Sequence, residues 1–375
     1  MMSGGANAIA TLLFIFFTYF AITPSAFSVR PMATSYPRPL HPGGLSLPPM
    51  VEDLIPIATT ISSSVSKDDA KSEDVVLQKD LLLVRPPDME SLWEWYAYTK
   101  RQTDSDPSWG RIWPTALTLA RFTMQSLQSG EKDGNVNCLD LTHELNEQEQ
   151  VHIKQAVKAL QTTSHIIELG CGLGLAGLSF AVSAGSAECT AIKRTVTFLD
   201  REQYALHCVM ASAAINGVAT APISNEQRVV DGTTPLITAR SSIDDWTSTD
   251  KNICYDDLLL DALDCDNKHT LILASDILYE PSSMDSLATK LRNLLHPTDG
   301  GYVLITDPEK ERTAGCRSAL VESVKEMGGK VAILPISQPK NNGIALNKSM
   351  LIDSDVDIDG NLAKTVLIVM HFNGV

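Results

Sequence analysis

The chain has 375 residues, a formal net charge of −15 and a hydrophobic content of 44%. This length and apolar content allow one large domain or two small ones with a substantial core. The acidic balance argues against nucleic acid as the main partner, because a phosphate backbone needs a basic protein face. Seven scattered cysteines, none in a Cys-x-x-Cys pair, argue against a zinc site or a disulfide framework, so we expect no metal.

Residues 1–27 have the pattern of a signal-type segment. An apolar stretch from Ala6 to Ile22 ends at Thr23-Pro24-Ser25-Ala26-Phe27. A short apolar core followed by proline and small residues is typical of a secretory-type signal. An uncleaved membrane anchor over residues 6–22 is the alternative, because no Lys or Arg precedes the core.

Residues 28–70 form a transit-like or disordered segment in this interpretation. From Ser28 to Val51 there is no Asp or Glu, while Arg, Ser, Thr and Pro recur. A signal core followed by Ser25-Ala26-Phe27 and such a segment resembles the bipartite plastid leader of algae with secondary plastids. The resemblance implies plastid localisation, with the secretory pathway as the alternative.

Residues 71–162 are expected to form an N-terminal extension. Within it, Trp113-Pro114 precedes a helical pattern, and a proline suits the first turn of a helix because its missing N–H costs nothing there. A polar insertion from Gln128 to Asn146 follows, and then a helix from Glu147 to Gln161.

Residues 163–375 alternate between strand and helix patterns, which predicts parallel βαβ units and a sheet covered on both faces. The predicted strands are His165–Leu169, Val196–Asp200, Thr270–Ala274, Tyr302–Thr306, Lys330–Pro335 and Thr365–Phe372. The predicted helices are Leu175–Ala184, Gln203–Asn216, Ser283–Leu295 and Thr313–Met327.

The turn after the first of these strands carries the main functional signal. It reads Glu168-Leu169-Gly170-Cys171-Gly172-Leu173-Gly174 and leads into a helix. Glycines there let a ligand approach the backbone, and the helix N-terminus presents free N–H groups to the same place. Read from Gly172, the run is also a G-x-G-x-x-G dinucleotide fingerprint. The turn therefore predicts a nucleotide-like cofactor. Both S-adenosylmethionine and NAD remain possible from the turn alone.

Three acidic positions help to separate these cofactors. Glu168 suits a cofactor with a positive charge and would be unhelpful beside a pyrophosphate. Asp200 ends the second strand, where a carboxylate can bind both ribose hydroxyls of either kind of cofactor. Ser275, Asp276 and Tyr279 follow the strand Thr270–Ala274, and strand ends converge on the ligand crevice of an open α/β sheet.

A specific family resemblance follows from motifs that occur in order along the chain. They are Trp113-Pro114, the Glu168 to Gly174 turn, Asp200, Asp245-Trp246 and Ser275-Asp276-Ile277-Leu278-Tyr279-Glu280. The set resembles methyltransferase family 16, which are seven-β-strand S-adenosylmethionine-dependent methyltransferases and include many protein-lysine methyltransferases. It spans roughly Trp109 to Phe372.

The resemblance implies a Rossmann-like, seven-stranded, mostly parallel doubly wound α/β sheet with helices on both faces. It implies S-adenosylmethionine as cofactor and a lysine of a protein as the methyl acceptor. The implied cofactor-binding residues are Trp113, Glu168, Gly170, Cys171, Gly172, Gly174, Asp200, Trp246 and Ser275. Asp200 would bind the ribose and Trp246 would stack on adenine. Asp276 and Tyr279 would be catalytic, with Asp276 orienting the acceptor amine and Tyr279 shaping the methyl channel.

Other functions remain open at this point. The chain could methylate a nicotinamide-like small molecule, or be a catalytically silent module that binds the cofactor and other proteins. An NAD-dependent oxidoreductase would need a hydride-site His, Lys or Tyr pair after the fourth strand, and the sequence shows none there. Three stretches are long for the family core and leave the acceptor site undefined, namely Gln128–Asn146, Thr249–Lys268 and Gln338–Asn361.

Overall fold

The computed structural model describes residues 48–62, 74–100, 107–128, 146–186, 193–220, 237–246, 270–336 and 364–374. These residues lie in one compact unit, Arg38–Val375. The predicted signal-type segment and the stretches 249–268 and 338–361 fall outside the described residues, as does 128–146 except for its two ends. Within the described ranges, no helix is long and apolar enough to cross a membrane.

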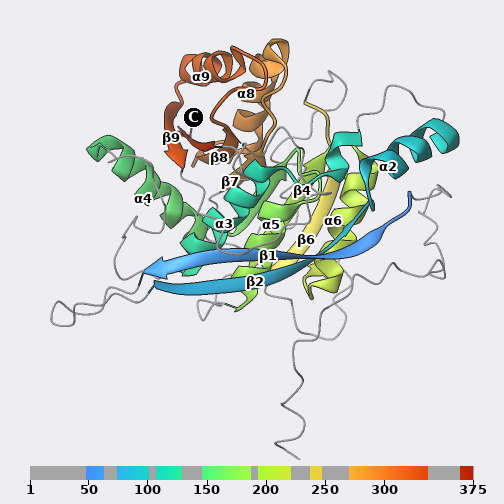
Figure 1. Ribbon diagram of the computed structural model, residues 1–375. Coiled ribbons are helices and arrows are strands. Elements are labelled where there is room, and N and C mark those ends of the chain that lie inside the picture. The colour runs from blue at the N-terminus through green and yellow to red at the C-terminus, as the bar shows by residue number, and fades with distance from the viewer. Residues whose placement is uncertain are drawn as a thin grey trace, which may run out of the picture. The chain divides into compact units, whose positions relative to one another are not determined.

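An eight-stranded sheet forms the centre of this unit, in the order β5-β6-β4-β3-β7-β8-β10-β9 (Figure 1). Neighbouring strands from β5 to β8 are parallel, and β10 is antiparallel to both β8 and β9. This confirms the predicted, mostly parallel α/β class, with the two-residue β5 as the extra edge strand. The bounds are β3 (His165–Leu169), β4 (Arg194–Asp200), β5 (Ala219–Thr220), β6 (Ile237–Ile243), β7 (Thr270–Ser275), β8 (Gly301–Pro308), β9 (Lys330–Ile336) and β10 (Thr365–Phe372).

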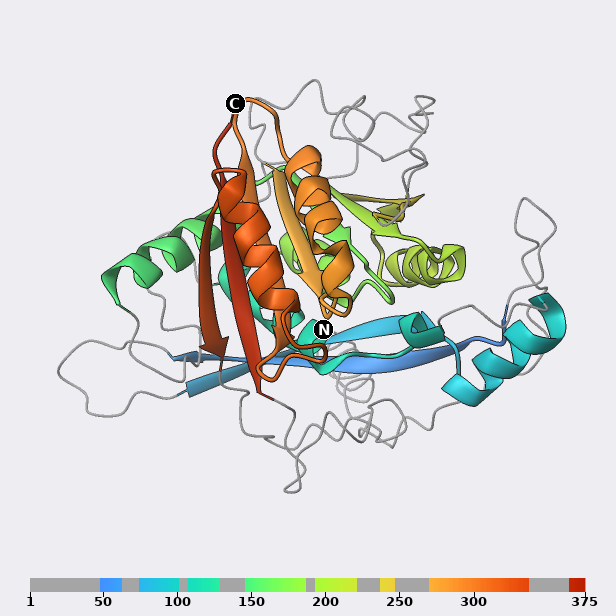
Figure 2. The same ribbon diagram turned by 90° about the horizontal axis from the view of Figure 1, so that it is seen from above.

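Helices cover both faces of the sheet (Figure 2). Successive strand residues point to opposite faces, so Ile166 joins one apolar cluster and Ile167 the other. One face packs against α3 (Pro114–Gln128), α4 (Glu147–Thr162), α5 (Leu175–Ser186) and α6 (Gln203–Ile215). The other packs against α8 (Met284–Leu294), which follows the short η4 (Pro281–Ser283), and against α9 (Cys316–Glu326). The core is therefore a sheet between two helical layers.

A long antiparallel hairpin lies outside the sheet and joins strands β1 (Val51–Ser62) and β2 (Asp74–Arg85). Its buried side chains Ile55, Ile57, Leu81 and Leu83 belong to the same apolar cluster as α3 and α6. Strand β1 thus lies before residue 70, within the segment predicted to be transit-like or disordered. The composition of residues 51–62 does not predict this strand, because the residues with which it pairs lie elsewhere in the sequence.

The predicted elements of the core coincide with observed ones to within a few residues, but the two-residue β5 is absent from the sequence prediction, and so is β6. Its sequence, Ile-Thr-Ala-Arg-Ser-Ser-Ile, has no continuous apolar run, yet it pairs with β4 along its whole length. Pairing with a neighbouring strand, which local sequence does not encode, decides this element.

The order of the strands places a ligand crevice at β3. The chain runs from β3 to β4 on one side and returns to β7 on the other. Ligands of open α/β sheets bind at such a switch point, outside the carboxyl ends of the strands. The glycine turn leaves β3 at this point.

Candidate functional site

The turn between β3 and α5 has a backbone that only glycines adopt without strain. Gly170, Gly172 and Gly174 have φ angles of 61°, 49° and 69°. The Cys171 N–H donates to the Leu199 carbonyl at 3.1 Å, which ties the turn to the end of β4. A Cβ on Gly174 would lie 2.8 Å from Val209, so packing as well as φ selects glycine there.

Glu168 supports this turn from beneath. Its carboxylate accepts hydrogen bonds from the Gly177 N–H at 2.7 Å and the Ala176 N–H at 3.3 Å, both in the first turn of α5. The side chain is fully buried, and burial raises its pKa to about 8. Glu168 does not line the pocket described below. The carboxylate is directed at the amides of α5, and the contact of Glu168 with a cationic cofactor stays a prediction.

Asp200 lies at the carboxyl end of β4 and faces the turn. Its Oδ2 accepts from the Gly172 N–H at 2.8 Å, and its Oδ1 accepts from the Glu202 N–H at 2.9 Å. The residue is buried, and burial raises its pKa to about 6. The two backbone bonds hold the carboxylate at the edge of the crevice with further lone pairs available to a ligand.

A cavity of about 320 Å³ opens above these strand ends. Of the residues predicted for the site, every one except Glu168 lines it: Trp113, Gly170, Cys171, Gly172, Gly174, Asp200, Trp246, Ser275, Asp276 and Tyr279. Five separate parts of the chain thus converge, as the switch-point rule predicts.

Trp246 forms the wall beside the first glycine. The indole is buried, and a Cβ on Gly170 would lie 3.3 Å from its ring, so the glycine lets the two come together. The indole Nε1 is buried without a hydrogen-bond partner among the described residues. The Asp244 N–H donates to the Asp200 carbonyl at 2.9 Å, and the Asp244 carboxylate forms a buried ion pair with Lys290 at 2.7 Å. These contacts fix the segment that carries Trp246.

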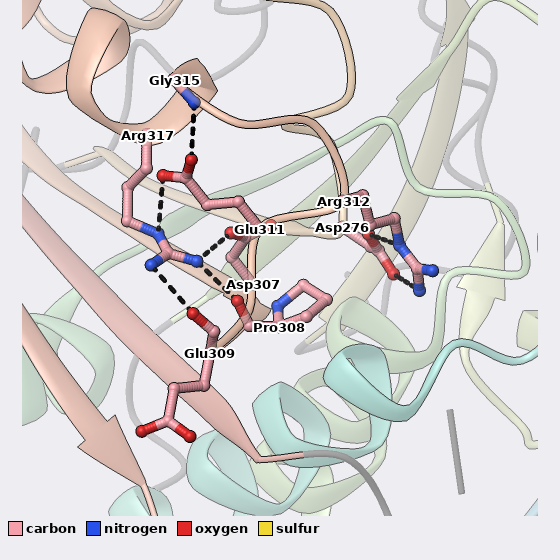
Figure 3. Close-up of polar contacts among 8 residues, drawn as sticks. All are labelled: Asp276, Asp307, Pro308, Glu309, Glu311, Arg312, Gly315 and Arg317. Atoms are coloured by element: carbon pink, nitrogen blue, oxygen red, sulfur yellow. Dashed lines mark hydrogen bonds and ion pairs between the residues drawn. The ribbon is translucent and has the colours of Figure 1, made fainter. Parts of the chain in front are cut away.

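The cavity is also lined by the predicted catalytic pair. Asp276 follows β7 with a left-handed φ of 54°, and Tyr279 is 40% exposed. Both oxygens of Asp276 accept hydrogen bonds from Arg312, at 2.8 and 2.7 Å (Figure 3). The Asp276 carboxylate is therefore already paired with an arginine. The sequence prediction assigned it a hydrogen bond to the acceptor amine and did not include this partner.

Several further pocket residues are absent from the sequence prediction. Ser108, Trp109, Arg111 and Ile112 come from or follow η2 (Pro107–Gly110), and Arg312 comes from the loop after β8. The Trp109 indole N–H donates to the Tyr96 hydroxyl at 3.1 Å, which anchors this wall to η1 (Tyr96–Lys100), the continuation of α2 (Met89–Trp95). The sequence did contain a signal for this wall, because a tryptophan and an arginine, Trp109 and Arg111, stand just before the Trp113-Pro114 pair.

Cys171 has no reactive character in this environment. Burial, with the nearby acids Asp200 and Glu168, raises the pKa of its thiol well above the ordinary value. Across the described ranges, no group of three or more His, Cys, Asp or Glu side chains could hold a metal ion.

Residues 99–231 match the family model described as lysine methyltransferase. No curated protein matches the chain. The match, together with the sheet order and the glycine turn, identifies the chain as an S-adenosylmethionine-dependent methyltransferase, similar over those residues to the lysine methyltransferase family.

Solved structures of methyltransferases are similar at a low level. A SAM-dependent methyltransferase from Methanosarcina mazei is 12% identical, with a TM-score of 0.34 and coverage of 62% of this chain and 100% of that chain. Precorrin-6y C5,15-methyltransferase from Geobacter metallireducens is 11% identical, with a TM-score of 0.30 and coverage of 64% and 96%. Such low scores support no conclusion about the site or the substrate.

The residues present fit S-adenosylmethionine. A Cβ on Gly172 would lie 3.4 Å from the Trp109 carbonyl, so the glycine leaves room where both residues line the cavity. The Trp246 indole offers a flat ring and a buried Nε1 without a partner among the described residues, which suits the adenine base of the cofactor. Asp200 at the end of the second strand of the sheet suits ribose hydroxyls.

Proposed function

We propose that this methyltransferase acts on the side-chain amine of a lysine in a protein. The observation that carries the proposal is that Trp113, Asp276 and Tyr279 share the cavity with the glycine turn, in a chain whose residues 99–231 match a lysine methyltransferase family. The net charge of −15 complements a cationic acceptor surface.

The chain's residues have separable tasks in this reaction. Gly170, Gly172 and Gly174 form the turn against which the cofactor would lie, Asp200 would hold the ribose and Trp246 the adenine. S-adenosylmethionine, when bound, supplies an electrophilic methyl group. The protein therefore contributes mainly by positioning the acceptor and excluding water.

The acceptor must lose a proton before it can react, and a lysine in water has a pKa of about 10.4. A partly closed, aromatic site lowers that pKa because burial disfavours the charged ammonium. Trp113 and Tyr279 provide such walls in the cavity that Asp276 also lines.

The proposal is tested with the full chain, methyl-labelled S-adenosylmethionine and a cell extract as the acceptor pool. Label recovered in protein and released by hydrolysis as methyllysine supports the proposal, while label recovered only in small molecules contradicts it. Asp276→Ala is expected to lose most of the transfer while still binding S-adenosylhomocysteine. Binding of NAD without binding of S-adenosylhomocysteine would overturn the cofactor assignment as well.

We also propose, from the sequence alone, that the leader directs the chain to a plastid. The signal-type stretch, the Ser25-Ala26-Phe27 junction and the acid-free segment after it support this. A fusion of residues 1–47 to a fluorescent protein in an alga with a secondary plastid tests the proposal. Replacement of Phe27 should redirect the fusion away from the plastid, whereas secretion of the unchanged fusion would contradict plastid targeting.

A further inference from the structure

Arg312 lines the cavity and binds the carboxylate of Asp276. Its Nε donates to Oδ1 at 2.8 Å and its Nη2 donates to Oδ2 at 2.7 Å, in the bidentate geometry that suits guanidinium and carboxylate (Figure 3). The Asp276 side chain is only 4% exposed and that of Arg312 28% exposed. The pair is therefore partly shielded from water, and its two charges largely cancel.

The same guanidinium also contacts Trp113. Its central carbon lies 4.5 Å from the centre of the Trp113 ring, within the range of a cation–π interaction. Arg312 thus joins the residue before α3 to the residue after β7, and all three side chains line the cavity.

The backbone of Asp276 is itself held in an uncommon conformation. Its φ of 54° is left-handed, and its N–H donates to the Thr306 carbonyl at 2.9 Å. Such conformations persist in non-glycine residues only where surrounding contacts impose them. The bond to Thr306 and the grip of Arg312 together determine where the carboxylate lies.

The loop that carries Arg312 is braced at several points (Figure 3). Arg317 donates to the Asp307 carboxylate at 2.6 Å and to the Pro308 carbonyl, and Glu311 accepts from the Gly315 N–H at 2.7 Å. Thr313 donates to the Tyr279 carbonyl at 2.8 Å. Successive loop residues therefore contact both members of the Asp276–Tyr279 pair.

We propose that Arg312 is a positioning residue of the acceptor site, which keeps Asp276 in a neutral ion pair so that the amine does not meet a lone carboxylate. The inference rests on the proposed function, because it places the acceptor beside Asp276. A lone carboxylate would stabilise the ammonium form of a lysine, which cannot react, whereas a neutral pair exerts no such preference.

The test compares two ligands that differ in charge at one atom. S-adenosylmethionine carries a sulfonium, and S-adenosylhomocysteine is neutral there. Their dissociation constants are measured by calorimetry for the wild type and for Arg312→Gln. Loss of the guanidinium leaves the Asp276 charge uncompensated, so the preference for the cationic ligand should rise roughly two- to fivefold.

Three further variants separate charge from structure. The double variant Asp276→Asn with Arg312→Gln should return the preference to the wild-type value, and Arg312→Lys, which keeps the charge, should stay near it. Lys310→Gln removes an exposed cation from the same loop and should change nothing. An unchanged preference in Arg312→Gln, or one that the double variant does not restore, would overturn the inference.

The outcome is independent of whether a lysine is the acceptor. If the wild type binds both ligands but transfers no label to protein, the proposed function fails while the charge measurement still stands. If label reaches protein and Arg312→Gln leaves both the ligand preference and the transfer rate unchanged, only the role of Arg312 fails.

Discussion

The Glu168 carboxylate accepts a 2.7 Å hydrogen bond from the Gly177 N–H, and a Cβ on Gly177 would lie equally close to that oxygen. The third glycine of the apparent G-x-G-x-x-G fingerprint therefore makes room for the acid before the turn. Packing against Glu168 therefore explains why a glycine stands at the third position of this dinucleotide-like spacing. The same hydrogen bond connects α5 to β3.

The protonation of Glu168 should make stability depend on pH. Its pKa rises from an ordinary 4.5 to about 8 on folding, so between these values the folded chain binds a proton that the unfolded chain releases. Stability from this group is fully present below pH 4.5 and is lost as pH rises through about 8. Urea unfolding of the wild type should give a free energy of unfolding that declines as the pH rises from 6.5 to 8.

Glu168→Gln keeps an acceptor oxygen and removes the titration, so its unfolding free energy should vary less over the same interval. Asp200 and Asp307 also have pKa values raised to about 6, and the interval above 6.5 limits their contribution. An equally steep decline in Glu168→Gln would rule out this assignment.

Gly172 offers a test of the cavity that separates binding from folding. Gly172→Ala places a methyl group at a position with a φ of 49°, and the nearest atom to it is 3.4 Å away, so the cost in stability should be about 1 kcal/mol. The methyl group narrows the cavity, and the affinity for S-adenosylhomocysteine should fall at least about tenfold, the equivalent of 1.4 kcal/mol.

Gly217→Ala is the matched control for this change. Gly217 has a φ of 76°, has open space around its Cβ position and does not line the cavity. It should lose similar stability in a thermal melt and keep its affinity. Equal affinity in the two variants would show that Gly172 is not part of the binding surface.

Asp200 should make cofactor binding depend on pH in the opposite sense to stability. Burial raises its pKa to about 6, so below that pH the carboxyl group is protonated and loses an acceptor for ribose hydroxyls. Calorimetry with S-adenosylhomocysteine should show weaker binding at pH 5 than at pH 7.5. Asp200→Asn should bind weakly at both pH values, and a drop of wild-type size in that variant would contradict the prediction.

The ion pair between Lys290 and Asp244 should be essential for folding, although it lies outside the cavity. Both side chains are almost fully buried, at 2% and 1% exposure, and they meet at 2.7 Å. Lys290→Met leaves a buried carboxylate without its partner and should destabilise the chain by about 3–5 kcal/mol. Denaturant unfolding measures this change.

The double variant Lys290→Met with Asp244→Leu removes both charges and should recover much of that loss. Lys325→Met, in the last turn of α9, replaces an exposed lysine and should have little effect. A double variant as unstable as Lys290→Met would show that packing of the lysine stem, rather than the charge, is what matters.

Local sequence sufficed for the elements that carry their own apolar pattern. The bounds of β3 and β10 agree with prediction because each holds a run of β-branched or other apolar residues and is followed by a glycine-containing break. Strands β1, β2 and β6 were not predicted. Their formation depends on pairing with strands that local sequence does not specify.

The site divides in the same way. The sequence by itself determined the glycine turn, Asp200 and the Asp276–Tyr279 pair, because the spacing of residues around strand ends places them at one edge of a parallel sheet. Only the tertiary structure decided that Glu168 accepts hydrogen bonds from helix amides and that Arg312 pairs with Asp276. Packing decides the direction of a buried side chain, and it brings Arg312 to Asp276 although the two lie 36 residues apart. A local sequence pattern contains neither kind of information.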